Sequence, residues 1–413
     1  SAATSLSSRT VNDLASFSRE DDAASTQSRS APPRKPFVTK TNGRTYLSDP
    51  TLPYPLPVDL QELHRQSLRT LLLFQLFGGP VCSPSFAKRP PTRVLDLGCG
   101  YGFWSMMCHS YFSRKGHSNI SFTGLDIAAL GGNWAEQPPD KNMQWTFVQH
   151  DMRNIPFPFA DGEFDLVMCK ELSLVNRLPQ FQELIDEFLR LLKPGGVLEA
   201  WDCDHPIRML RPHGEQENQV TELGAYHLGN STPLSGPQNT YLYEYNGWIN
   251  KYLESQQLLN WPCANIGSYF VQEPLLTGHG SKRLAIPLTE VRWEREVVGG
   301  VVTKDGKSYI DTGRLSGRGP NNNNNSSSSN VDGNVTGEKR CRVLGSAQLA
   351  LRQTALQTVL GFIEAMEPVL RETSGKKQDE WDAWMGKLMK ELIEKDGASC
   401  GECLEVGAWW GMK

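Results

Sequence analysis

The residues of this chain that are best placed to do chemistry lie in the stretch Asp96-Leu-Gly98-Cys-Gly100-Tyr-Gly102, where a predicted strand turns into a helix. Glycines there permit a tight turn and let a ligand approach the backbone, and the start of a helix offers unpaired N–H groups. A dinucleotide-binding motif, GxGxxG, would have glycine at position 103, where this chain has Phe103. A carboxylate just before the glycines instead suits a ligand that brings an amine rather than a pyrophosphate.

Two further acidic residues follow predicted strands. Asp126 closes a strand at residues 122–126, and Asp151 comes after a strand at 145–148. Ligands of open α/β sheets lie at the carboxyl ends of the strands, so three acidic strand ends indicate one site. A carboxylate at Asp126 would accept from both hydroxyls of a ribose, and Asp151 would accept from an exocyclic amine of a nucleobase. Asp151 could instead cap a following helix, and that alternative stays open.

Strands and helices alternate along the chain and position these residues. Asp59 is expected to cap a helix that ends at Gly78-Gly79, and a later helix is expected to end at Pro194-Gly195-Gly196. Strands are predicted at residues 93–97, 122–126, 145–148, 164–169, 197–201 and 404–410, and further helices at about 346–371 and 379–395. The alternation predicts an α/β fold with a doubly wound, mainly parallel sheet.

Composition and charge exclude several classes of protein. The chain has 413 residues, 38% of them hydrophobic, and a net charge of −4, so neither a wholly disordered chain nor nucleic-acid binding by bulk positive charge is expected. The longest apolar run, residues 71–77, is much shorter than the roughly 20 residues of a membrane span, which predicts a soluble protein. The nine cysteines are dispersed except for Cys400 and Cys403, so we expect reduced thiols and no metal site.

This set of motifs resembles the class I S-adenosylmethionine-dependent methyltransferases. The glycine motif, Asp126, Asp151-Met152, Phe164-Asp165 and Leu192-Lys-Pro-Gly-Gly196 occur in the order of that family. The resemblance implies a seven-stranded Rossmann-like sheet and S-adenosylmethionine as cofactor, with the glycines around its methionine part, Asp126 at its ribose and Asp151-Met152 at its adenine. The residues expected to bind the cofactor are Asp96, Gly98, Cys99, Gly100, Gly102, Asp126, Ile127, Asp151, Met152, Cys169 and Lys170.

A closer resemblance, over most of residues 43–413, is to the fungal velvet-associated regulator (LaeA-like) methyltransferases. It rests on Gly43-Arg44-Thr-Tyr46, on Tyr54-Pro-Leu-Pro57 and on the ending Trp410-Gly-Met412-Lys413, in which Met412 stands where arginine is common. The resemblance implies, as an alternative to an enzyme, a cofactor-binding regulatory protein that acts through protein partners in transcription or secondary-metabolism control.

Two segments depart from globular composition. Residues 1–42 are rich in serine and are expected to form a disordered tail, and residues 299–344 contain five asparagines followed by four serines, which predicts a low-complexity insertion. The methyltransferase domain is expected at residues 43–298, with 345–413 completing the same domain.

No catalytic residue is evident. Methyl transfer is an in-line displacement at carbon that depends on alignment and exclusion of water, and a base is needed only if the acceptor must lose a proton. Weak candidates are Glu171, Glu199 and His205, and His205 beside two carboxylates would have a raised pKa. The alternative, a polar loop without a catalytic role, stays open. Asp165 is expected to support the fold rather than to do chemistry.

The predicted function is methyl transfer to an unidentified small-molecule or protein acceptor. Aromatic residues are dense between residues 130 and 261, and they could either wall an acceptor pocket or pack the core. Phe103 disfavours a nicotinamide dehydrogenase. Regulatory protein partners are possible on this interpretation. We expect no binding to membranes or nucleic acids, and a cytoplasmic or nuclear location.

Overall fold

The computed structural model describes residues 37–40, 42–130, 140–212, 220–229, 232, 234–295 and 344–413, with the short strands β12 (Val301–Val302) and β13 (Ser308–Tyr309). The predicted tail lies outside the described residues except for residues 37–40 and 42, and the predicted insertion lies outside them except for these two strands and Leu344. The described residues belong to one compact unit. The predicted domain boundaries stay predictions.

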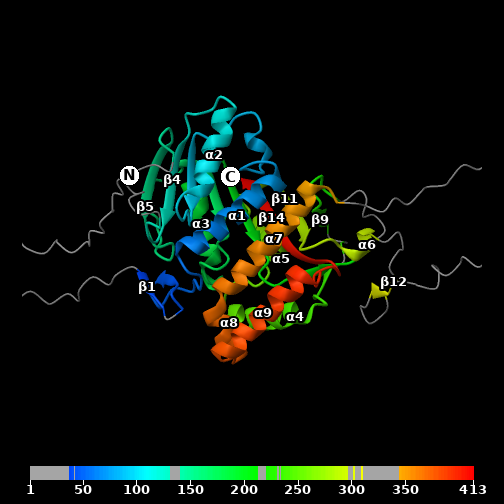
Figure 1. Cartoon of the computed structure of the whole chain (residues 1–413). Coiled ribbons are helices and arrows are strands. Elements are labelled where there is room, and N and C mark those ends of the chain that lie inside the picture. Colours follow the sequence, from blue (N-terminus) through cyan, green and yellow to red (C-terminus); the bar gives the residue numbers. More distant parts are fainter. Residues whose placement is uncertain are drawn as a thin grey trace, which may run out of the picture. The chain divides into compact units, whose positions relative to one another are not determined.

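A ten-stranded sheet is the centre of this unit (Figure 1). Its strands are β3 (Arg93–Leu97), β4 (Ser121–Asp126), β5 (Gln144–Gln149), β6 (Phe164–Lys170), β7 (Leu192–Cys203), β8 (Arg208–Leu210), β9 (Tyr226–His227), β10 (Leu234–Ser235), β11 (Thr277–Pro287) and β14 (Glu402–Met412). Strands β5-β4-β3-β6-β7 are parallel neighbours, β14 joins β7 antiparallel, and β11 joins β14 antiparallel. The predicted α/β fold is confirmed, and three strands of two or three residues extend the expected seven to ten.

The described part of the chain has helices before, between and after these strands. They are α1 (Leu60–Phe77), α2 (Phe103–Arg114), α3 (Phe181–Leu191), α4 (Thr240–Ser255), α5 (Pro262–Gln272), α6 (Arg292–Arg295), α7 (Ser346–Ala365), α8 (Glu367–Ser374) and α9 (Gln378–Glu394). Asp59 caps α1 by accepting from the Glu62 N–H, and Gly78 ends the helix with a φ of 81°, as predicted. A small sheet of β1 (Phe37–Thr39) and β2 (Thr45–Leu47) precedes α1.

Two predicted helix boundaries are wrong. Helix α3 ends at Leu191, and the Pro194-Gly195-Gly196 stretch belongs to β7, because Gly195 donates to the Lys413 carbonyl and Lys413 donates to the Gly196 carbonyl. The helix predicted at about 346–371 is two helices that meet at Met366. Pro368 lies in the first turn of α8, where its missing N–H is tolerated.

Hydrophobic side chains cover both faces of the sheet because alternate strand residues point to opposite sides. Val94 belongs to a cluster that includes side chains of α1, α2 and α7, whereas Leu95 belongs to a second cluster with side chains of α3 and α5. Helices α1 and α7 lie side by side on the first face (Figure 1). Residues that lie nearly 300 positions apart in the sequence are thereby brought to one end of the sheet.

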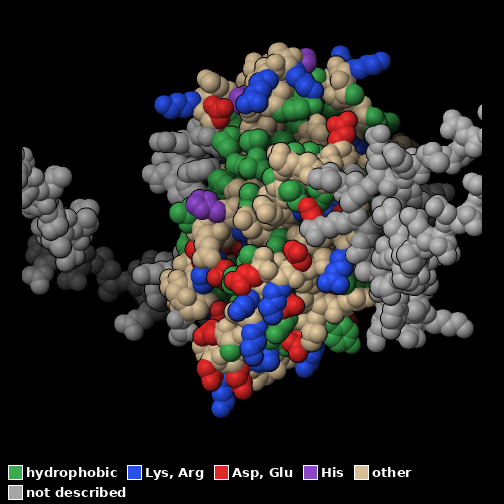
Figure 2. Space-filling model, turned by 45° about the vertical axis from the view of Figure 1, so that its right-hand side comes forward, with side chains coloured by type: hydrophobic (Ala, Val, Ile, Leu, Met, Phe, Trp, Pro, Cys, Tyr) green, Lys and Arg blue, Asp and Glu red, His purple; other side chains and the backbone are tan. Residues whose placement is uncertain are grey.

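The surface over α8 and α9 mixes acidic and basic side chains (Figure 2). Within the described part of the chain, no helix is both long and apolar enough to cross a membrane.

Candidate functional site

A cavity lies at the carboxyl ends of the parallel strands, and the space it encloses, its solvent side included, is about 1060 Å³. The predicted site residues that line it are Gly98, Gly100, Asp126, Ile127, Asp151, Met152, Lys170, Glu171 and His205. The structure therefore brings the glycine motif, the ends of β4 and β6, and the loop after β5 to one place.

The glycine loop forms one wall of this cavity and is tied to the end of β4. Gly100 donates its N–H to Asp126 Oδ2 at 2.8 Å, and Ile127 donates its N–H to Asp126 Oδ1 at 2.7 Å. Gly100 has a φ of +57°, and no atom lies within 4 Å of the position that a Cβ would take there. The backbone at Gly100 is therefore open to a ligand, beside a carboxylate that two N–H groups hold in place.

Burial raises the pKa of Asp126 to about 6, against the effect of those backbone hydrogen bonds. Asp126 is thus mostly ionised at neutral pH. Each of its oxygens can then accept a further hydrogen bond from a ligand.

Four predicted cofactor residues do not line the cavity. Asp96 is buried under the loop and accepts from the Ser105 hydroxyl at 2.7 Å, and Gly102 is the residue before α2. Cys99 is also buried, and Cys169 lines a neighbouring apolar cavity between the sheet and helices α3 and α5. At these positions the four residues can support the glycine loop and strand β6, but they do not face a ligand in the cavity.

Asp151 lies at the cavity but is already engaged by Arg153. The Arg153 N–H donates to Asp151 Oδ1 at 2.9 Å, and its Nη2 is 2.6 Å from Oδ2. Burial works to raise the pKa of Asp151, but the bonds from Arg153 outweigh it and lower the pKa. A turn and not a helix follows Asp151, so the helix-capping alternative is not what the structure shows.

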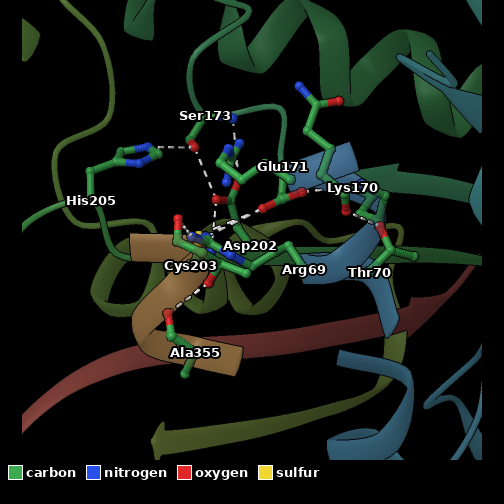
Figure 3. A network of polar contacts seen from close by, with 12 residues as sticks. Arg69, Thr70, Lys170, Glu171, Ser173, Asp202, Cys203, His205 and Ala355 are labelled. Carbon is green, nitrogen blue, oxygen red and sulfur yellow. Dashed lines mark hydrogen bonds and ion pairs between the residues drawn. The ribbon is translucent and has the colours of Figure 1, made fainter. Parts of the chain in front are cut away.

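Glu171 and Lys170 form an ion pair at the end of β6 (Figure 3). Their charged atoms are 3.2 Å apart, and Arg69 from α1 lies 3.5 Å from the other side of the Glu171 carboxylate. Burial works to raise the pKa of Glu171, but Lys170 and Arg69 outweigh it and lower the pKa to about 2. Glu171 is therefore ionised and is a poor base.

His205 lines the cavity but does not have the raised pKa that the sequence predicted. Burial, and after it the charge of Arg69, lowers the pKa of His205 to about 3. Its ring is stacked on Phe362 with centroids 5.5 Å apart, and its Nε2 lies 2.9 Å from the Ser173 hydroxyl (Figure 3). The carboxylates next to it in the sequence do not pair with the ring, so His205 is neutral at physiological pH.

Glu199 is not at the cavity. It is fully buried and accepts from the N–H groups of Cys82 and Ser83 at 2.6 and 3.1 Å and from Trp201 Nε1 at 2.7 Å. Asp165 accepts from the Thr92 and Arg93 N–H groups and pairs with Lys193, which fits the predicted support of the fold.

The dense aromatic residues between positions 130 and 261 do not form the wall of the cavity. Trp134 lies outside the described residues. The other candidates for such a wall do not line the cavity; they are Trp145, Tyr226, Tyr241, Tyr243, Tyr245, Trp248 and Trp261. Trp248 packs against Trp384 with ring centroids 4.8 Å apart, which is the core-packing alternative. Tyr54 and Phe362 supply the aromatic rings of the cavity wall instead.

The sequence interpretation missed two arginines of α1, Arg65 and Arg69, which also line the cavity. Arg69 is 3% exposed and lies one turn from Leu73, which is fully buried. A charged residue on the core-facing stripe of an amphipathic helix is unusual, and that signal was present in the sequence.

A second buried group, Asp204, Cys263 and Glu405, has side-chain atoms close enough to hold a metal ion. Arg208 lies 3.3 Å from Asp204 and 3.6 Å from Glu405, and Arg283 also pairs with Glu405. The guanidinium groups of Arg208 and Arg283 therefore already supply the positive charge that a metal ion would bring to these carboxylates.

Comparisons with known proteins agree with this geometry. Residues 94–196 match a family described as a methyltransferase domain. The chain is 31% identical over 189 residues to the secondary metabolism regulator laeA of Aspergillus niger, covering 45% of this chain and 46% of that protein. It is 32% identical over 154 residues to a phthiotriol/phenolphthiotriol dimycocerosates methyltransferase of Mycobacterium tuberculosis, covering 35% of this chain and 53% of that protein.

The chain thus spans about half the length of the curated relatives it matches. Among solved structures, a phosphoethanolamine N-methyltransferase 2 of Haemonchus contortus in complex with S-adenosylhomocysteine aligns with a TM-score of 0.34 and 13% identity, over 86% of this chain and 59% of that one. Residues 94–196 are a methyltransferase domain, and the chain resembles the class I S-adenosylmethionine-dependent methyltransferases.

Proposed function

We propose that this protein uses its methyltransferase domain to transfer a methyl group from S-adenosylmethionine to a small-molecule or protein acceptor. One observation carries the proposal: within the matched domain, the Gly100 N–H donates to Asp126 at 2.8 Å in the wall of the cavity. This bond joins the glycine loop to the acidic end of the next strand, which is the place where sheets of this type bind nucleosides.

The residues at the cavity fit such a cofactor. The space above Gly100 admits a ligand at the backbone, and the Asp126 carboxylate has the lone pairs to accept from two ribose hydroxyls. Gly98 would hold the methionine part, and Met152, which is 7% exposed, would pack against the adenine. When bound, the cofactor supplies an electrophilic methyl group on a sulfonium.

The chain's own residues would contribute alignment rather than proton transfer. Glu171 is held ionised with a pKa of about 2, and His205 is held neutral with a pKa of about 3, so neither is a good base near pH 7. We therefore infer an acceptor group that attacks without first losing a proton to the protein. Tyr54, Phe362 and the surrounding leucines would exclude water from the reacting atoms.

The proposal is tested by calorimetric titration of the full chain with S-adenosylmethionine, S-adenosylhomocysteine and NAD, using the wild type and Asp126→Asn. We expect the first two ligands to bind and NAD not to bind. Loss of a hydrogen bond to a charged group costs about 1.5–3 kcal/mol, so Asp126→Asn should weaken binding roughly 10- to 150-fold.

Asp161→Asn is the matched control, because Asp161 is an exposed carboxylate that pairs with Arg190 away from the cavity. Absence of binding to both adenosyl ligands, or unchanged affinity in Asp126→Asn, would contradict the proposal.

A second candidate is a regulatory protein that binds the cofactor without turnover, and the name of the Aspergillus niger relative favours it. Incubation with methyl-labelled S-adenosylmethionine and a fungal extract separates the two candidates. Label that reaches an acceptor supports the enzyme, and binding without any transfer supports the regulator.

A further inference from the structure

Two arginines one helical turn apart face the cavity from α1. Arg65 and Arg69 are four residues apart, a spacing that places side chains on one face of a helix, and their side chains are 9% and 4% exposed. Arginine is rarely buried to this extent unless each of its donors has a partner. Their hydrogen bonds therefore indicate what each still needs.

Each guanidinium is only partly satisfied. Arg65 donates through Nε and Nη2 to Glu62 at 2.9 and 2.7 Å. Arg69 donates through Nη1 to Cys203 Sγ at 2.7 Å and through Nη2 to the Thr358 carbonyl at 3.2 Å. Among the described residues, no acceptor is found for Arg65 Nη1 or for Arg69 Nε.

A buried amide near the arginines also lacks a partner. Asn176, 3% exposed, lines the same cavity, and its Oδ1 accepts from no donor in the part of the chain that the structure describes. Because buried polar groups are nearly always hydrogen-bonded, three unpaired groups on the wall of one cavity indicate a polar ligand.

Positive charge gathers around Glu171. Arg65, Arg69 and Lys170 all act on its carboxylate, and Arg65 also pairs with Glu62. Asp96 and Asp202 belong to the same electrostatic neighbourhood, because Lys170 acts on Asp96 and Glu171 acts on Asp202. The unpaired donors of the two guanidinium groups therefore favour a negatively charged group on the ligand.

A carboxylate matches this requirement in charge and shape. It brings a negative charge, and its two oxygens suit the planar fork of a guanidinium. The wall also has an apolar part, with the rings of Tyr54 and Phe362 among leucines and valines. Arg65 lies 5.4 Å from the Phe362 ring centroid, so the charged and apolar parts adjoin.

We propose, building on the function proposed above, that the methyl acceptor is a small molecule with an apolar body and a carboxylate, and that Arg65 and Arg69 bind this carboxylate. The cofactor's own methionine carboxylate has the same chemistry. The acceptor is favoured because most contacts of the two arginines, those with Cys203, Thr358 and Phe362 of β7 and α7, lie outside the matched domain at 94–196, whereas the ion pair of Arg69 with Glu171 lies inside it.

The test compares an acid with its neutral amide on the full chain. Binding of 4-(trifluoromethyl)benzoate and of 4-(trifluoromethyl)benzamide is followed by fluorine NMR, with and without saturating S-adenosylhomocysteine. We expect the wild type to bind the acid at least tenfold more tightly than the amide. Equal binding, or binding of neither probe, overturns the proposal without any substitution being made.

The variants Arg65→Gln and Arg65→Lys then test whether Arg65 causes the tighter binding of the acid than of the amide. We expect Arg65→Gln to lose the preference for the acid and Arg65→Lys to keep part of it, while both bind S-adenosylhomocysteine within twofold of the wild type. Arg190→Gln is the control, because Arg190 pairs with Glu187 and Asp161 away from the cavity. A preference for the acid that persists in Arg65→Gln overturns the assignment.

Two outcomes separate this proposal from related ones. In the first, Arg65→Gln reduces the affinity for S-adenosylhomocysteine at least tenfold but leaves the affinity for 5′-methylthioadenosine, which has no carboxylate, unchanged. The arginines then bind the cofactor, and the acceptor proposal is overturned. If the wild type binds no adenosyl ligand, the proposed function fails, and the acid–amide comparison without cofactor still decides whether the cavity binds a carboxylate.

Discussion

The two ends of the cavity are built in different ways. The end with Gly98, Gly100 and Asp126 comes from short consecutive segments, and its main polar contacts join backbone N–H groups to one carboxylate. The end with Arg65, Arg69 and Phe362 joins α1 to α7, and its contacts are between buried side chains. The first arrangement depends on local backbone geometry, whereas the second depends on packing between distant parts of the chain. Substitutions at the glycine end should therefore mainly impair cofactor binding. Substitutions at the arginine end should mainly reduce the stability of the protein.

Gly100→Val should give the largest effect, the loss of at least 100-fold in S-adenosylhomocysteine affinity, together with a loss of about 1–3 kcal/mol in stability because valine is strained at this positive φ. The substitution puts a β-branched side chain at a φ of +57° and fills the open space above the loop. Calorimetry and thermal unfolding measure the two quantities. Gly236→Val is the control, because Gly236 also has open space around it but no positive φ and does not line the cavity. Retained binding in Gly100→Val would remove the distinction between the two ends.

Arg69→Gln should mainly reduce stability, by about 1–3 kcal/mol in the free energy of unfolding, because the buried Cys203 Sγ and the Thr358 carbonyl lose their donors and Glu171 loses one of its cations. Urea unfolding measures this loss. Arg153→Gln provides the comparison at the other end, where the arginine is 23% exposed and its loss should destabilise the protein by less than about 1 kcal/mol. Equal losses in the two variants would contradict the comparison.

A smaller effect is expected from pH. Burial, and after it the charge of Glu171, raises the pKa of Asp202 to about 7, and burial raises the pKa of Asp96 to about 6. A carboxyl group with a raised pKa binds its proton more tightly in the folded state, so its contribution to stability is complete below the unfolded pKa near 4 and is lost as pH rises through the folded value. The free energy of unfolding should fall by at least about 1 kcal/mol between pH 5 and pH 8.

Urea unfolding at these two pH values measures the difference. With further pH values between them, the slope of the free energy of unfolding against pH can be followed in two variants. Asp202→Asn should make this slope smaller up to about pH 7, and Asp96→Asn should make it smaller only up to about pH 6. Stability that rises over this interval would show that other groups dominate.

The same contrast explains what the sequence could predict. The glycine motif, Asp126 and the parallel strands were predictable because each depends on a short segment with its own residue pattern. The start of β7 was not, because Leu192 pairs with Phe164 of β6 and Gly195 and Gly196 bond to Lys413, which follows β14 more than 200 residues away. The pKa of His205 was predicted in the wrong direction because its burial depends on Phe362 of α7.

The position of β14 has a consequence for the order in which the sheet can be completed during synthesis. This strand, residues 402–412, lies between β7 and β11, and among the described strands it is the one that connects β11 and its neighbour β9 to the rest of the sheet. At ribosomal rates of roughly 5–20 residues per second, the chain between β11 and β14 takes several seconds to be made. Throughout that interval the edge of β7 has unpaired backbone groups, and an edge of this kind can pair with another chain. The nascent chain is therefore expected to be most open to pairing with other chains in the interval before β14 emerges.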